Sequence, residues 1–202
     1  MSAPLGVILA GGLATRMGGG DKGALPLGTS TLLDHVIGRL SPQVQGIVLN
    51  ANGDGTRFSH LGLPVVADSI EGFAGPLAGV LAGLDWAAEQ GVTSIVTAAA
   101  DTPFFPHDLV AQLQLAADGM EHPLALAATP DPKRGKSRHP TFGLWPVALR
   151  DDLCKALNQG LRKVVQWTDS HDGKLAMFPI DQIDPFFNVN TPEDLARAEM
   201  ML

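Results

Sequence analysis

The segment GVILAGGLATRMGGGDKG, at residues 6–23, combines the residue types of a phosphate-binding loop. A short apolar run breaks there into glycines, which enclose Arg16 and end beside Lys22. Glycine lets backbone N–H groups approach an anion closely and adopt positive φ, while the two basic side chains supply positive charge. The segment therefore predicts a loop that binds phosphate groups after the first strand.

Two common phosphate motifs do not account for this loop. Gly18, Gly20 and Gly23 match GxGxxG, but the predicted strand ends about eight residues earlier, whereas the dinucleotide fingerprint follows its strand directly. That fingerprint also needs an acidic residue roughly twenty positions further on, and the stretch 38–45 contains none. A P-loop is excluded because Lys22 is followed by glycine rather than by Ser or Thr.

The side chains that commonly serve as nucleophiles or zinc ligands show no matching pattern. The six histidines have no HExxH or other ligand spacing, and the chain has no GxSxG motif. A phosphate can itself be the attacking group, because its second pKa of about 6 leaves it ionised at neutral pH. Such a reaction needs positioning and charge neutralisation by lysine, arginine and Mg²⁺, with no general base.

Length, charge and cysteine content restrict the class of protein. With 202 residues, of which 45% are hydrophobic, the chain is expected to form a single domain over residues 1–202. The formal charge of −7 disfavours nucleic acid as a partner, because phosphate contacts along a duplex require a basic face. The start of the chain has no basic region or long apolar run, so we expect a cytoplasmic protein with no membrane partner. The single cysteine, Cys154, is expected to pack inside.

Apolar runs alternate with longer amphipathic segments through most of the chain, which predicts an α/β fold with a doubly wound, mostly parallel sheet and helices on both faces. The first half, residues 1–130, is interpreted as the nucleotide-binding half, and residues 131–202 as the acceptor-side half. In the first half strands are expected over 6–10, 46–52, 63–68, 94–101 and 124–130, with helices over 30–40, 76–90 and 106–118. In the second half strands are expected over 139–145 and 174–180, with helices over 151–159, 162–170 and 190–201.

Two features of the second half are more specific. The last helix has Thr191 as a capping residue, Pro192 at its first position and acidic residues in its first turn. Before the first strand of this half lies a basic loop with Lys133, Arg134, Lys136 and Arg138, which is either a solvated loop or a lid that holds phosphate.

Polar groups follow the predicted strands at the points where ligands bind in open α/β sheets. They are Gly11 and Gly12, Asn50 and Asn52, Asp68, and Asp101. A carboxylate beside a polyphosphate is the usual protein ligand of Mg²⁺, which makes Asp101 the candidate metal ligand. A capping role in the turn before Pro103 would explain the same residue.

The segment GFAGPLAG, at residues 72–79, places glycines such as Gly75 immediately before a predicted helix. The N–H groups at that helix start can face an anion or let a flat base lie on the backbone. Helix initiation alone explains the same pattern. The amides of Asn50 and Asn52 likewise suit either a turn or the recognition of a base or ribose.

The succession LAGG, RMGG, DK, NAN, VVADS, GPLAG, DTPF, RHP, GLRKVVQW and NVNTPEDL resembles the molybdenum cofactor guanylyltransferases, and it extends over nearly the whole chain. The resemblance implies a nucleotide-diphospho-sugar-transferase-like fold, with GTP and molybdopterin as substrates and Mg²⁺ as cofactor. It further implies transfer of GMP to molybdopterin, which releases pyrophosphate and gives the guanine dinucleotide form of the cofactor. Molybdoenzyme apoproteins or other cofactor-biosynthesis proteins would be protein partners.

The resemblance also implies roles for individual residues. The catalytic group would be Arg16, Lys22 and Asp101, with Asp101 also the metal ligand. The nucleotide would contact Leu9, Ala10, Gly11, Gly12, Lys22, Asn50, Asp68, Gly75 and Asp101. The acceptor would contact Asn188 and Asn190. A separate hypothesis adds Arg162 and Lys163 to the acceptor contacts, because the first half of the chain already uses its strand ends for the nucleotide. Two positions depart from the family pattern: Ala100 stands where a cysteine is usual, and Gly53 stands where a basic residue is frequent.

Two other functions remain open from the residues. A molybdopterin cytidylyltransferase, or another small-molecule nucleotidyltransferase such as a sugar-phosphate enzyme, would use the same loop with a different base or acceptor. The sugar enzymes generally carry further elements that 202 residues hardly accommodate. A non-catalytic carrier of the pterin cofactor would have no need of both Lys22 and Asp101, and the chain contains both.

Overall fold

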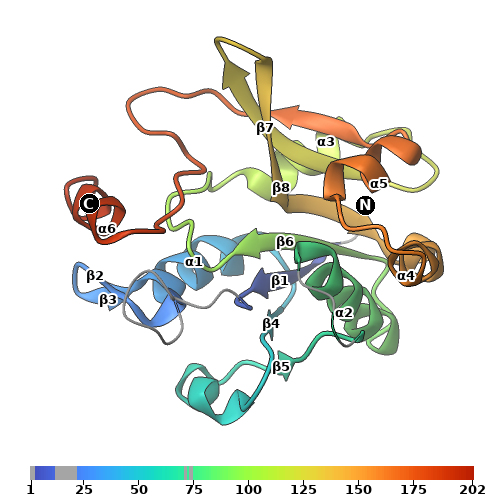
Figure 1. Cartoon of the computed structure of the whole chain (residues 1–202), viewed down its shortest axis with the longest axis horizontal. Coiled ribbons are helices and arrows are strands. Elements are labelled where there is room, and N and C mark those ends of the chain that lie inside the picture. Colours follow the sequence, from blue (N-terminus) through green and yellow to red (C-terminus); the bar gives the residue numbers. More distant parts are fainter. Residues whose placement is uncertain (1–2, 12–21, 71, 73–74) are drawn as a thin grey trace.

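A computed structural model describes residues 3–11, 22–70, 72 and 75–202 of the chain. Arg16 and Gly12, two of the residues with predicted roles, lie outside these ranges. The described residues form a seven-stranded sheet in the order β5-β4-β1-β6-β8-β7-β9, together with a small hairpin of β2 and β3 (Figure 1). The strands of the large sheet are β1 (Leu5–Leu9), β4 (Ile47–Asn50), β5 (Val65–Val66), β6 (Ser94–Ala99), β7 (Ala125–Asp131), β8 (Gly135–Pro146) and β9 (Lys174–Met177).

The sheet is parallel except at one strand. The neighbours β5, β4, β1 and β6 pair in parallel, and so do β7 and β9. Strand β8 lies between β6 and β7 and runs antiparallel to both. The predicted mostly parallel α/β sheet is therefore confirmed. The fourth and fifth predicted strands, β6 and β7, are not neighbours in the sheet. Strand β8, from the second half of the chain, lies between them.

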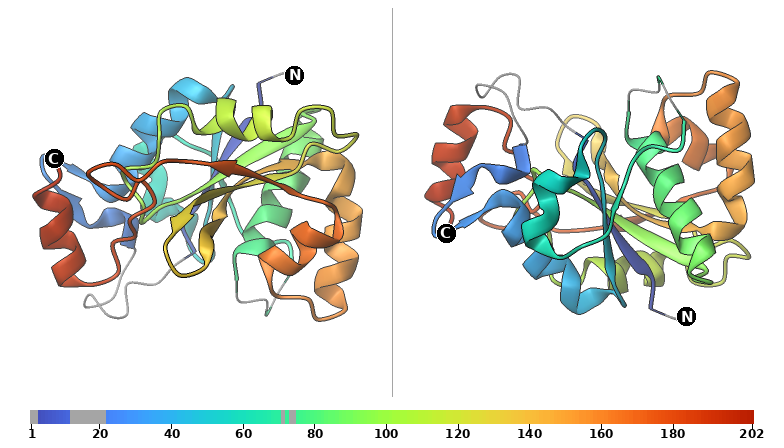
Figure 2. Two further views of the ribbon diagram at one scale, coloured as in Figure 1. Left: turned by 90° about the horizontal axis from the view of Figure 1, so that it is seen from above. Right: turned by 90° about the horizontal axis from the view of Figure 1, so that it is seen from below.

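Helices cover both faces of the sheet, as predicted. They are α1 (Leu32–Leu40), α2 (Pro76–Glu89), α3 (Leu109–Ala116), α4 (Arg150–Asn158), α5 (Val164–Ser170) and α6 (Pro192–Glu199). The left panel of Figure 2 shows α1 and α3 on one side of the sheet, with α2, α4 and α5 on the other. Ile8 of β1 contributes to the core under α1 and α3, whereas its neighbour Val7 contributes to the core under α2, α4 and α5. Successive side chains of a strand point to opposite faces, so one short strand supplies both cores.

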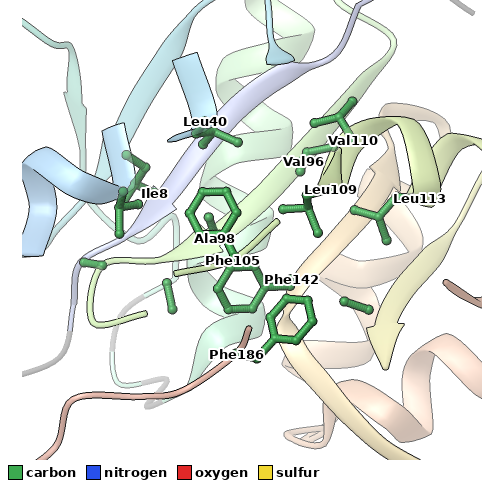
Figure 3. Close-up of a cluster of buried hydrophobic side chains, with 14 of the residues drawn as sticks. Ile8, Leu40, Val96, Ala98, Phe105, Leu109, Val110, Leu113, Phe142 and Phe186 are labelled. Carbon is green, nitrogen blue, oxygen red and sulfur yellow. The ribbon is translucent and has the colours of Figure 1, made fainter. Parts of the chain in front are cut away.

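The core on the α1 and α3 side is aliphatic around β1 and β6 and aromatic toward the C-terminal segment (Figure 3). Phe105 and Phe142 lie with ring centroids 5.5 Å apart, and Phe186 lies 4.9 Å from Phe142. Phe186 therefore anchors the segment that precedes α6 in this core. A third, smaller core joins α6 to the hairpin of β2 (Pro26–Leu27) and β3 (Ser30–Thr31) through Leu27, Leu32, Val189 and Ala198.

The start of α6 agrees with its sequence signals. Thr191 accepts a hydrogen bond from the N–H of Asp194, the Asp194 side chain binds back to the cap, and Pro192 occupies the first turn. The same reciprocal capping box, formed by Thr31 and Asp34, begins α1. Each box satisfies N–H groups that have no partner within the helix.

The basic segment around residues 133–138 is not a loop throughout, contrary to the sequence-based expectation. Strand β8 begins at Gly135, so Lys136 and Arg138 belong to a hairpin strand paired with β7. The hairpin turns tightly because Asp131 accepts from the N–H groups of Lys133 and Arg134, at 2.8 and 2.9 Å, and Gly135 adopts φ +76°. The polar side chains of this segment predicted a loop, but a strand also forms here, because the ladder hydrogen bonds that pair it with β7 involve only the backbone.

The register between β7 and β8 changes in the middle of the hairpin. Leu126 pairs with Gly143, but the next residue, Ala127, pairs with His139. Residues 140–142 of β8 therefore form a bulge that β7 does not match. Pro140 lies in this bulge, where its missing N–H removes no ladder bond, and such bulges redirect side chains.

Among the described residues, the structure has no helix with the length and apolar character needed to span a membrane.

Helix α2 packs against the sheet at two glycines, where a side chain would clash with residues of the strands. A Cβ atom on Gly83 would lie 2.7 Å from Val7 Cγ2, and a Cβ on Gly79 would lie 2.2 Å from Asn50 Oδ1. Neither neighbour is the free end of a long flexible chain, so a methyl group there must displace the helix or the strand. The close approach brings the start of α2 to the carboxyl ends of the strands.

We predict that Gly79→Ala lowers the free energy of unfolding by about 1–3 kcal/mol, because overpacking outweighs the gain in helix propensity. The matched control is Gly38→Ala on the exposed side of α1, where a Cβ would meet nothing within 4 Å. That change should raise stability by up to about 1 kcal/mol. Urea denaturation measures both, and an equal gain for the two variants would contradict the packing argument.

Candidate active site

A cavity of about 520 Å³ opens at the carboxyl ends of β1, β4 and β6. Its volume lies within the range of small-molecule sites. Strand ends, the start of α2 and the C-terminal segment all contribute to its wall. The lining residues are Leu9, Ala10, Gly11, Lys22, Gly23, Asn50, Asn52, Asp68, Gly75, Pro76, Ala99, Ala100, Asp101, Thr141 and Asn188.

One side of the cavity carries an amide and carboxylate cluster from the ends of β4 and β5. Asn50 donates to Asp68 Oδ1 at 3.0 Å, and Asn52 donates to Asp68 Oδ2 at 2.8 Å. The N–H of Asp68 returns a bond to Asn52 Oδ1 at 2.9 Å. Asn50 is buried and also donates to the carbonyl of Val66. These bonds hold the Asp68 carboxylate in one orientation at the cavity wall.

The other side carries a cation and a carboxylate from segments far apart in the sequence. Lys22 Nζ lies 3.3 Å from Asp101 Oδ2, and the two side chains are 19% and 20% exposed. Lys22 also donates to the side-chain oxygen of Asn190. Such a partly buried ion pair keeps both charges at the cavity, where they can compensate other charges.

The C-terminal segment is bound to the end of β6 beside this ion pair. The N–H of Val189 donates to the carbonyl of Asp101 at 2.8 Å. The Thr102 hydroxyl donates to Asn188 Oδ1 at 2.6 Å and lies 3.2 Å from Asp101 Oδ1. Asn188 consequently lines the cavity, and Asn190 reaches it through Lys22.

Most residues that the sequence singled out, where the structure describes them, therefore meet at one cavity. Arg162 and Lys163 do not line it. They line a second hollow of about 430 Å³, which shares no lining residue with the first. Arg162 donates to the carbonyls of Leu157 and Leu161, at 3.0 and 2.7 Å, so it satisfies one backbone oxygen in the last turn of α4 and one just beyond the helix.

Sequence reasoning missed Thr141 and Thr102. Thr141 reaches the cavity from the β8 bulge, and Thr102 holds Asn188. The signal for Thr141 was Pro140, because a proline within a predicted strand indicates a bulge or an edge. No comparable signal identified Thr102, whose role depends on a segment that lies 86 residues further along the chain.

A cavity at the carboxyl ends of a mostly parallel sheet, with a lysine, carboxylates and glycine backbone in its wall, defines an α/β protein suited to a nucleotide. Solved structures share this fold. The molybdopterin-guanine dinucleotide biosynthesis protein A from Archaeoglobus fulgidus is 23% identical, with a TM-score of 0.69 and coverage of 98% of this chain and 97% of the other. The 2-C-methyl-D-erythritol 4-phosphate cytidylyltransferase from Thermus thermophilus is 20% identical, with a TM-score of 0.70 and coverage of 100% and 98%.

Sequence comparison identifies the family. The MobA-like NTP transferase domain matches residues 6–173. A molybdenum cofactor guanylyltransferase from Bradyrhizobium sp. (strain ORS 278) is 51% identical over 97% of this chain and 92% of its own length. One from Mesorhizobium japonicum is 48% identical over 98% and 95%. The chain belongs to the MobA-like nucleotidyltransferase family, and its curated relatives are molybdenum cofactor guanylyltransferases.

Proposed function

We propose that this protein transfers GMP from GTP to molybdopterin, which gives the guanine dinucleotide form of the cofactor and pyrophosphate. The observation that carries the proposal is the convergence of Lys22, Asp101 and Asp68 on one cavity in a chain about half identical to guanylyltransferases. In this proposal the Asp68 side holds the guanosine, and the Lys22 side holds the phosphates. The nucleotide is also proposed to contact the backbone of four further residues in the cavity wall, Leu9, Ala10, Gly11 and Gly75.

The reaction joins two phosphates. An oxygen of the acceptor phosphate forms a bond to the α-phosphorus of GTP, and the bond from that phosphorus to the pyrophosphate oxygen breaks. The acceptor phosphate is already ionised at neutral pH, so no side chain needs to remove a proton. Lys22 neutralises charge on the transferred and leaving phosphates, and Arg16 is proposed to add a second positive charge from the loop.

The residues at the phosphate side suit Mg²⁺. The described residues contain no group of three or more His, Cys, Asp or Glu side chains that could form a closed metal site. A single carboxylate fits Mg²⁺ bound mainly by phosphates and water, and Asp101 is the residue proposed to hold it. When bound, the ion neutralises negative charge on the phosphates.

The acceptor is proposed to enter from the C-terminal side of the cavity, where Asn188 and Thr141 line the wall and Asn190 binds Lys22. Arg162 and Lys163 lie in the connection between α4 and α5, where they line the second hollow. We propose that these two residues contact a part of the acceptor that lies away from the reacting phosphate. The reaction is proposed to occur in the cytoplasm, with delivery of the product to molybdoenzyme apoproteins or other biosynthetic proteins.

We predict that Lys22→Ala and Asp101→Asn each lower turnover at least ~100-fold with a retained fold, because each removes charge compensation at the reacting phosphates. Asp101→Asn should also weaken the dependence of the rate on Mg²⁺. Steady-state transfer at several Mg²⁺ concentrations tests both, with exposed Lys155→Ala as control. Near-normal turnover in either variant would refute the mechanism, and an unchanged Mg²⁺ titration would return Asp101 to a turn-capping role.

A second prediction concerns the base. Guanine offers N–H donors at N1 and N2 that the oriented Asp68 carboxylate can accept, and cytosine lacks this pair of donors at the matching edge. We expect strong preference for GTP over CTP, and loss of that preference in Asp68→Ala, because unpaired polar groups cost several kcal/mol. Competition assays with both nucleotides measure the ratio, and Asp54→Ala is the control. Efficient transfer from CTP by the unaltered protein would favour a cytidylyltransferase.

A third prediction separates the two ligands. Asn188→Ala and Arg162→Ala should each raise the KM for molybdopterin several-fold and leave the affinity for GTP unchanged, since both belong to the proposed acceptor side. Calorimetry with GTP and transfer kinetics with molybdopterin give the two quantities. A fall in GTP affinity would place the residue on the other ligand. An unchanged KM for molybdopterin in Arg162→Ala would mean that Arg162 only stabilises the end of α4 and does not contact the acceptor.

A further inference from the structure

The segment that carries Asn188 and Asn190 to the cavity has no regular secondary structure, so individual contacts must hold it. Its first anchor is Phe186, which is 4% exposed and packs edge-on against Phe142 and Phe178, with ring centroids 4.9 and 5.4 Å away. Only one residue separates this ring from the cavity residue Asn188. Any shift of Phe186 is therefore transmitted to the asparagines.

The ring of Phe186 also contacts His139 of β8. The two rings are stacked, with centroids 4.2 Å apart and an angle of 21° between their planes. His139 Nε2 lies 2.9 Å from the hydroxyl oxygen of Thr129, which is 1% exposed. The imidazole is thus fixed at one atom by β7 and covers the aromatic anchor with its face.

The environment of His139 favours the neutral ring. Burial lowers the pKa of His139 below its usual range, and the nearby carboxylate of Asp184 only partly opposes this effect. A neutral imidazole stacks on an aromatic ring without the cost of burying a charge. Histidine can both stack on Phe186 and form a hydrogen bond with Thr129. A phenylalanine at this position could stack but could not form that hydrogen bond.

We propose that His139 is a positioning residue, which acts through Phe186 to hold Asn188 and Asn190 at the acceptor end of the cavity. The assignment of that end to molybdopterin rests on the proposed function. His139 itself does not line the cavity. The residue immediately after it, Pro140, begins the bulge that brings Thr141 to the cavity wall, so one short stretch of β8 supports both parts of the acceptor side.

The test compares His139→Ala, His139→Phe and a matched control, His171→Ala. His171 is also half-buried, lies against a ring (Trp167, 4.6 Å between centroids) and binds a side chain (Asp152, 2.7 Å), but belongs to the α5 side of the sheet. The first measurement is hydrogen exchange of the Val189 amide, which bonds to the carbonyl of Asp101. The second is the KM for molybdopterin against kcat and GTP affinity.

We expect His139→Ala to speed exchange at Val189 at least ~10-fold and to raise the KM for molybdopterin ~5-fold, with GTP affinity unchanged. His139→Phe should restore most of the protection, because it keeps the stacking. His171→Ala should lower the melting temperature without either effect.

Wild-type exchange at Val189 in His139→Ala, or an equal acceleration in His171→Ala, would overturn the proposal. If the unaltered protein transferred no GMP, the proposed function would fail, while Val189 exchange in the same variants would still decide the role of His139.

Discussion

The contact of Lys22 with Asp101 and Asn190 is the interaction on which the site depends. It joins Lys22, in the N-terminal half of the chain, to the end of β6, 79 residues away, and to the C-terminal segment, 168 residues away. Without the ammonium group, the partly buried Asp101 carboxylate would lose this ion-pair partner, which is costly. The backbone bond from Val189 to Asp101 adds a second tie between β6 and the C-terminal segment. The segments that form the cavity are therefore held together by an ion pair, and the same two charged groups are the ones proposed to bind the ligands.

Small residues determine how closely the rest of the site can approach the sheet. Gly79 lets α2 lie against the amide of Asn50, and that amide in turn orients Asp68. Larger residues would move the helix start, with Gly75 and Pro76, away from the strand ends. The two sides of the cavity thus use different interactions: hydrogen bonds beneath a closely packed helix order the Asp68 side, and an ion pair orders the Lys22 side.

Much of this arrangement could be predicted from the sequence, because parallel strands bring their carboxyl ends to one edge. Asn50, Asp68 and Asp101 each follow an apolar run, and the structure brings all three to one cavity. The position of β8 could not be predicted, because apolar patterns identify strands but not their order in a sheet. Thr102 was missed for a related reason: its partner Asn188 is distant in the sequence. Arg16 lies outside the described ranges, so its role stays a prediction.

The place of β8 in the sheet has a consequence for synthesis of the chain. When β6, which ends at Ala99, leaves the ribosome, its future neighbour on one side is still incomplete, since β8 begins at Gly135 and ends at Pro146. The backbone N–H and C=O groups on that edge of β6 stay unpaired for that interval, and open edges of this kind promote pairing with other chains. The sheet of the first half of the chain is therefore complete only after β8, which belongs to the second half, has paired with β6. A fragment that ends before β8 would expose this edge permanently.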